Sequence, residues 1–297
     1  MSEEALNELM AWQQEFEKGC PPCNQECNQG RTCPARNKEK TMIVKEKVAE
    51  SGHWYAKDGT PTYTVKGKNG KERPTTLRDA RQLSLVPSVT TILGMAAKPA
   101  LDLWKQQQVL LSALTLPKID GESEQDYISR ILKDSKETGK KAAERGTHIH
   151  AMIQSYFEQK PIKEYVELAK ATDEALKETY GNRLWICERP FAHKLGFGGK
   201  CDLFSASNHH DFKQGIVVDI KTKEGDLENV QAYDEHLMQL AAYRVGLEIP
   251  DAMAANVFVS STTGQVKVIQ HSPEDLNKGW KMFKCLLDYW QLKNNHS

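Results

Sequence analysis

Asp219 and Lys221 have the types and the spacing needed to act together on a charged substrate. Side chains alternate between the two faces of a strand, so residues two apart project from the same face. Both follow an apolar run, residues 216–218, which predicts a central strand where an unpaired charge would be costly. Taken alone, the pair is also explained as a structural ion pair.

Two more acids stand on the strands predicted just before this one. Glu188 ends the predicted strand 184–188, and Asp202 follows two glycines that permit close approach of a backbone or a ligand. Each acid alone is also explained as a solvated strand end. Three carboxylates on consecutive strands would repel one another without a divalent cation, and Mg²⁺ or Mn²⁺ prefers such hard oxygen ligands. Together they predict a metal site.

A helix predicted over residues 234–246 places two polar side chains beside these strands. Gln239 and Tyr243 lie at positions i and i+4 and therefore share one face, with His236 one turn earlier. They could line the rim of the acidic cluster. Alternatively, Leu240 and its apolar neighbours face the core while Gln239 is simply solvated.

A helix predicted over residues 123–159 carries a basic ridge that leads to a histidine motif. The motif contains His148 and His150. The basic residues before it are Lys133, Lys136, Lys140, Lys141 and Arg145. This arrangement is typical of a phosphate track that ends at a metal, although a lysine run is also typical of a solvated face.

Apolar periodicity predicts an α/β chain with a central mixed sheet of about four or five strands flanked by helices. The predicted helices are residues 101–116, 123–159, 164–180, 234–246 and a closing helix that carries Trp280 and Trp290. The predicted strands are residues 184–188, 199–204, 216–221, 256–260 and 266–269. The first three strands follow one another directly, which indicates a meander. Ser88 stands where a helix N-cap would lie.

Charge and hydropathy exclude some classes of protein. Forty Lys and Arg balance forty Asp and Glu, so any nucleic-acid surface must be local. No apolar run approaches the ~20 residues that cross a bilayer, and the first residues have neither a secretion nor a transit signature. We therefore expect no membrane association and a cytoplasmic location.

Six motifs occur in the order found in one nuclease family. They are residues 87–90, 146–150, 187–191, 199–202, 219–221 and 239–244. On these motifs, the chain resembles PD-(D/E)xK superfamily nucleases of the RecB-like exonuclease branch, which includes phage exonucleases and the mitochondrial genome maintenance exonuclease. The resemblance spans about residues 86–246 and implies a restriction-endonuclease-like core.

The resemblance implies a metal site for one or two Mg²⁺ or Mn²⁺ ions. Asp202 and Asp219 would bind the metal. Glu188, His150 and the carbonyl of Ile220 would be further ligands or would orient water. Related proteins often carry an acid four residues after the histidine, where this chain has Gln154.

The resemblance also assigns residues to catalysis and to DNA. Lys221 would position or activate the attacking water and offset phosphate charge, while Gln239 and Tyr243 would steady the site. Ser88 and Thr90 would contact phosphate. Lys136, Lys140 and Arg145 are expected to contribute to DNA binding.

Four clustered cysteines precede this region, in a segment predicted as an N-terminal appendage. They are Cys20, Cys23, Cys27 and Cys33. Related nucleases with an iron–sulfur cluster draw cysteines from both ends of the nuclease domain, which favours a structural Zn²⁺ site here, with an iron–sulfur cluster or no metal as alternatives. The expected domains are residues 1–41 (helix and cysteine segment), 42–85 (β-hairpin region) and 86–297 (nuclease domain).

These observations predict a metal-dependent DNA exonuclease that acts in recombination, replication or repair. We expect a bacterial or phage-infected cytoplasm and linear DNA as substrate, with a recombination or replication protein as a further partner. Two alternatives stay open: a structure-specific endonuclease with the same chemistry, and a catalytically silent DNA-binding subunit on the same fold.

Overall fold

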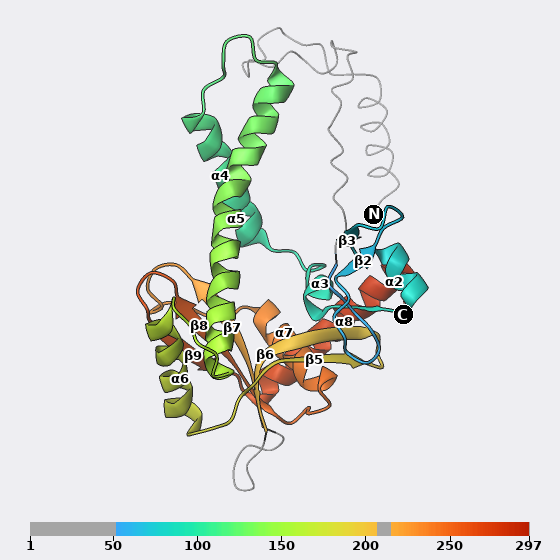
Figure 1. Ribbon diagram of the computed structural model, residues 1–297, viewed down its shortest axis with the longest axis vertical. Helices are drawn as coiled ribbons and strands as arrows, with labels where there is room; N and C mark the ends of the chain where they lie inside the picture. The colour runs from blue at the N-terminus through green and yellow to red at the C-terminus, as the bar shows by residue number, and fades with distance from the viewer. Residues whose placement is uncertain (1–51, 207–214, 297) are drawn as a thin grey trace, which may run out of the picture. The chain divides into compact units, whose positions relative to one another are not determined.

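The computed structural model, which describes residues 52–206 and 215–296, contains a five-stranded mixed β-sheet with helices on both faces (Figure 1). Its strands are β5 (Ile186–His193), β6 (Phe197–Ser205), β7 (Ile216–Lys223), β8 (Met253–Ser260) and β9 (Val266–Gln270). The predicted fold class is therefore confirmed. The predicted N-terminal helix and cysteine cluster lie outside the described residues.

The strands lie in sequence order across the sheet. β5, β6 and β7 pair antiparallel, as the predicted meander requires. β7 and β8 pair parallel, and β8 and β9 pair antiparallel. A parallel pair needs a crossover connection, and helix α7 (Asp234–Gly246) supplies it. This crossover carries the predicted Gln239 and Tyr243 back over the sheet.

Four of the other helices begin and end close to their predicted limits: α4 (Pro99–Thr115), α5 (Glu124–Phe157), α6 (Val166–Tyr180) and α8 (Pro273–Asn294). Two short helices have no predicted counterpart: α3 (Val89–Leu93), which follows the expected N-cap, and α2 (Leu77–Leu83), which lies inside the region expected to form only a β-hairpin. Ser88 caps α3 as predicted, because its side chain accepts a hydrogen bond from the Thr91 N–H. Among the described residues, we find no helix that is both long and apolar enough to cross a membrane.

Two hydrophobic cores lie on opposite faces of the sheet. The first core contains Val217 of β7, Leu240 of α7 and Phe283 of α8. The second core contains Val218 of β7 and Ile149 of α5, together with residues of α6. Because Val217 and Val218 point to opposite faces, β7 is buried on both sides, which explains its continuous apolar run.

The segment before α3 joins the first core. Strand β1 (Trp54–Tyr55) pairs with β4 (Val86–Pro87), and the Trp54 ring packs edge-on against Trp290 of α8 at 6.0 Å between centroids. A separate hairpin, β2 (Thr64–Lys66) with β3 (Glu72–Pro74), stands beside it. The described part of the expected hairpin region thus shares a core with the chain from residue 86 onward.

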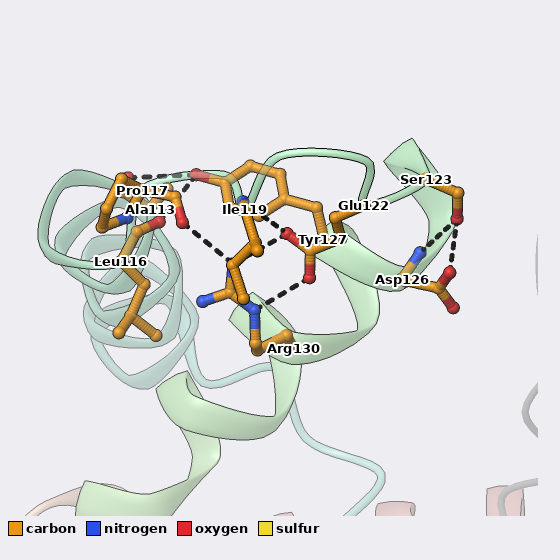
Figure 2. A network of polar contacts seen from close by, with 9 residues as sticks. All are labelled: Ala113, Leu116, Pro117, Ile119, Glu122, Ser123, Asp126, Tyr127 and Arg130. Carbon is orange, nitrogen blue, oxygen red and sulfur yellow. Dashed lines mark hydrogen bonds and ion pairs between the residues drawn. The ribbon is translucent and has the colours of Figure 1, made fainter.

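Polar contacts fix the connection between α4 and α5 (Figure 2). The Arg130 guanidinium donates two hydrogen bonds to the Glu122 carboxylate, and the Tyr127 hydroxyl donates to the Leu116 carbonyl at 3.0 Å. Arg130, with the Ile119 N–H, lowers the pKa of Glu122 to about 2. α5 then continues for 34 residues, about 50 Å, to the sheet.

Gly246, the last residue of α7, tests the packing of the first core. A Cβ atom at Gly246 would overlap the Phe191 ring, so Gly246→Ala should lower the free energy of unfolding by about 1–3 kcal/mol or more. Gly139→Ala in α5 is the matched control. There the nearest atom is Trp104 Cη2 at 3.4 Å, and helix propensity should stabilise by up to about 1 kcal/mol. Urea denaturation measures both, and equal effects would contradict the described packing.

Candidate functional site

Asp219 and Lys221 project from the same face of β7, as strand alternation predicts. Asp219 is 2% exposed, and its Oδ2 accepts hydrogen bonds from Lys221 Nζ at 2.8 Å and from Asn256 Nδ2 at 2.9 Å. Asn256 is the partner of Asp219 in the parallel pairing of β7 with β8. One oxygen of a buried carboxylate is therefore held by two donors on two strands.

Lys221 links this carboxylate to helix α7. Its Nζ also donates to Gln239 Oε1 at 2.9 Å, and Gln239 Nε2 donates to the Tyr243 hydroxyl at 2.7 Å. Burial lowers the pKa of Lys221, but the charge and hydrogen bond of Asp219 outweigh burial, and the net pKa is raised. An ammonium group has three N–H donors, so one remains without a partner among the described residues.

Asp202 lies where the pairing of β6 with β7 stops. The paired residues run from Ser205 with Ile216 to Leu203 with Val218, so Asp202 and Asp219 would be the next pair. Instead of a strand-to-strand bond, the Asp202 carboxylate accepts the backbone N–H of Ile220 at 2.7 Å. Two carboxylates thus lie on neighbouring strands at the point where the strands separate.

The strand on the other side of Asp202 is irregular at the same level. Pairing of β5 with β6 skips Glu188 and Asp202, and Glu188 has a left-handed backbone with φ of 53°. Cys201 belongs to the first core and Leu203 to the second, although residues two apart in a regular strand share a face. The side-chain alternation therefore shifts by one residue at Asp202, which places this carboxylate between the two layers.

Glu188 is near Asp202 in register, but its carboxylate points to another partner. It forms an ion pair with Lys200 of β6. We expected Glu188 at the end of its strand, whereas it lies inside β5, because β5 continues to His193. A left-handed conformation costs a residue with a Cβ atom about 1–2 kcal/mol, so the surrounding strands must impose it.

His150 of α5 reaches the site from the second-core side. Its Nδ1 lies 3.7 Å from Asp202 Oδ2, and its side chain is 34% exposed. Gln154, one turn later, points elsewhere and donates to Glu158 Oε1 at 2.8 Å. The structure thus brings His150 of this helix to the site, and it directs Gln154, where related proteins often carry an acid, away from it.

Negative charge at the site exceeds the positive charge beside it. Burial raises the pKa of Asp202 to about 6, and the neighbouring Asp219 charge adds to this effect against the opposing influence of His150. Burial also raises the pKa of Tyr243. His236 remains neutral, because burial, followed by the Lys221 charge, lowers its pKa to about 4. Two carboxylates therefore share a single lysine.

Asn256 and His271 belong to the site and were missed in the sequence. Asn256 is fully buried, and its Oδ1 lies 2.8 Å from His271 Nε2. His271 is 7% exposed and follows β9. The available signal was an asparagine within an apolar strand, Ala254 to Val259, because a buried amide needs partners. These two residues fix the orientation of the Asp219 carboxylate.

The carboxylate oxygens of Asp202 and Asp219 are donors of the kind that a hard divalent cation prefers. Asp202 and Asp219 each use Oδ2 for the hydrogen bonds described above, which leaves both Oδ1 atoms without a bonded partner in the described chain. No cluster of three or more His, Cys, Asp and Glu side chains set for a metal occurs within residues 52–206 and 215–296. A cation here would keep several waters, which is the preference of Mg²⁺.

The residues expected to contact DNA differ in their exposure and in their partners. Ser88 is 3% exposed and its hydroxyl serves the α3 cap, whereas Thr90 is exposed. On α5, Arg145 pairs with Glu224, and Lys140 lies 3.8 Å from Glu144. The basic ridge of α5 is therefore partly neutralised by its own neighbours.

Comparisons with known proteins give no family assignment. No protein-family model and no curated protein matches the chain. Among solved structures, similar chains include a candidate exonuclease from Eubacterium rectale, with 12% identity and a TM-score of 0.37 over 52% of this chain and 69% of that one. The protein SSO0001 has 16% identity and a TM-score of 0.28 over 64% and 87%. At these scores neither likeness bears on the function.

The raised pKa of Asp202 predicts a pH-dependent stability in the absence of divalent metal. A carboxyl whose folded pKa is about 6 and ordinary pKa is 3.8 stabilises the fold when protonated, and this contribution is lost as pH rises from about 4 through 6. Asp202→Asn should therefore become more stable relative to the original protein between pH 4 and 7, measured by urea denaturation in EDTA. A difference that does not change with pH would contradict the described environment.

Proposed function

We propose that this protein is a metal-dependent deoxyribonuclease, and that it acts as an exonuclease. The observation that carries the proposal is the ordered array in which Lys221 bridges Asp219 and Gln239 beside the Asp202 carboxylate. A structural ion pair would need neither a second, partly buried carboxylate nor a lysine with an unused donor. The six motifs of the sequence add the family resemblance.

Asp202 and Asp219 would hold one or two Mg²⁺ or Mn²⁺ ions through their Oδ1 atoms, with His150 and the Ile220 carbonyl beside them. When bound, the metal supplies Lewis-acid activation of water and of the scissile phosphate. Glu188 would become a further metal ligand once its carboxylate releases Lys200. The raised pKa of Asp202 supports this assignment, because burial and then the Asp219 charge disfavour the ionised carboxylate, and a bound cation would offset both effects.

Lys221 would act through its third N–H. Two of its donors are used by Asp219 and Gln239, which fixes the direction of the remaining one. That donor would orient the attacking water or stabilise charge that develops on the phosphate oxygens. Tyr243 holds Gln239, so the α7 residues would serve to position Lys221 rather than to react.

Asn256 and His271 would act as positioning residues for Asp219. Asn256 holds Asp219 Oδ2, and His271 holds Asn256, so the orientation of the carboxylate depends on both. Groups that orient a metal ligand in this way typically change metal affinity or activity 10- to 100-fold when removed.

Cleavage of end-labelled linear single- and double-stranded DNA with Mg²⁺ or Mn²⁺ tests the proposal. Asp219→Ala should abolish cleavage, and Lys221→Met should reduce the rate by about 10²–10³, because each removes a group from the reacting centre. Glu228→Gln, an exposed acid after β7, is the matched control and should cut normally. Circular dichroism shows whether each variant is folded.

The same assay separates the alternatives. A covalently closed circle should resist an exonuclease, and cutting of the circle would assign an endonuclease instead. Retention of DNA without cleavage in any divalent metal would assign a silent binding subunit. Unchanged cleavage by a folded Asp219→Ala protein would remove the proposed site.

A further inference from the structure

Positive charge is concentrated in the described segment before β4. Residues 52–85 contain seven Lys and Arg against three Asp and Glu, whereas the whole chain is balanced at forty and forty. The rest of the chain therefore carries the compensating negative charge. A local basic surface in a neutral protein is the electrostatic footprint of a polyanion partner.

The lysines on and beside the β2–β3 hairpin are free to meet such a partner. Four exposed lysines in this segment make no ion pair with any residue that the structure describes: Lys57, Lys66, Lys68 and Lys71. Arg73 is different, because Asp79 holds it at 2.6 Å. Glu72 faces Lys66 across the hairpin without an ion pair to it.

The basic ridge of α5 offers less free charge, although the exposed Lys133 makes no ion pair with the residues that the structure describes. Three of its cations have acidic partners: Lys140 with Glu144, Lys141 with Glu137, and Arg145 with Glu224. A polyanion would have to displace these carboxylates, whereas it can bind the hairpin lysines directly. The sequence alone did not distinguish the two surfaces, because it does not show which lysines are paired.

The hairpin holds its lysines in a fixed turn. The Gly67 N–H donates to the Lys71 carbonyl at 2.8 Å, and the Lys71 N–H donates to Asn69 Oδ1 at 3.1 Å. Gly70, with φ of +76°, adopts the left-handed conformation that the turn requires. A turn formed in advance lowers the cost of ordering the backbone when a partner binds.

The hairpin is also connected to the strand that carries Asp202. Tyr63, just before β2, shares a 2.7 Å hydrogen bond with Tyr55 of β1. Tyr55 packs on Gly198 of β6, where a Cβ atom would lie 2.8 Å from Tyr55 Cβ. Gly198 precedes Asp202 by four residues on the same strand. A chain of side-chain contacts therefore connects the hairpin to the strand that carries Asp202.

We infer that the β2–β3 hairpin, through Lys66, Lys68 and Lys71, binds the phosphate backbone of the DNA on which the site acts. The inference rests on the proposed nuclease function for the identity of the polyanion. Lysine contacts to phosphate are independent of sequence and release counterions, so binding through them is strongly salt-dependent.

Salt-dependent binding of the full chain to labelled duplex DNA in EDTA tests this surface without cleavage. The Lys66→Gln/Lys68→Gln/Lys71→Gln protein should lose about 2–3 units of the slope of log K against log salt, since each duplex phosphate contact contributes about 0.9. A control with Lys163, Lys278 and Lys281 changed to Gln, all exposed, should keep the full slope.

A third variant, Lys136→Gln/Lys140→Gln/Lys141→Gln, sets the α5 ridge against the hairpin. Loss of slope in this variant, with the hairpin variant unchanged, would overturn the inference while leaving the nuclease function in place. Hairpin-dependent binding without cleavage in any divalent metal would support the inference and remove the nuclease function. A protein that neither binds nor cuts DNA would overturn both.

Discussion

The repulsion between the Asp202 and Asp219 carboxylates is the constraint around which the site is built. Lys221 neutralises Asp219, while Asp202 has only a backbone N–H and a nearby His150 in compensation. The structure holds the pair from both sides, with Asn256 and His271 behind Asp219 and with α7 fixing the lysine. Like charges held close together lower the free energy of unfolding, and the same two carboxylates form the proposed cation site.

The irregular strands follow from the same constraint. Regular pairing would place the Asp202 carboxylate on one face of the sheet, but the shift of alternation at Asp202 and the left-handed Glu188 put it between the two layers. There it meets β7 on one side and α5 on the other. Strain of this type persists where surrounding structure imposes it, and here both cores supply that support.

Most of the fold could be predicted because the spacing of apolar residues in the sequence indicates which side chains of a helix or strand are buried. The alternation in β7 and the helical spacing of α5 and α7 located their elements and placed Asp219 beside Lys221. Other features had no local signal. The left-handed Glu188 depends on its neighbours on β6, the role of His271 depends on a pairing between β8 and β9, and the neutralisation of Arg145 depends on Glu224, distant in sequence. Each arises from tertiary contacts that periodicity does not encode.

Binding of Mn²⁺, followed by the electron paramagnetic resonance signal of the free ion, tests the central claim without reference to activity. The account predicts that the original protein binds Mn²⁺ and that Asp202→Asn and Asp219→Asn each weaken binding by at least about 10-fold, because both supply oxygen ligands. Glu228→Gln should bind as the original does. Binding that both aspartate variants retain in full, or no binding by the original protein, would contradict the claim that these two carboxylates form a metal site.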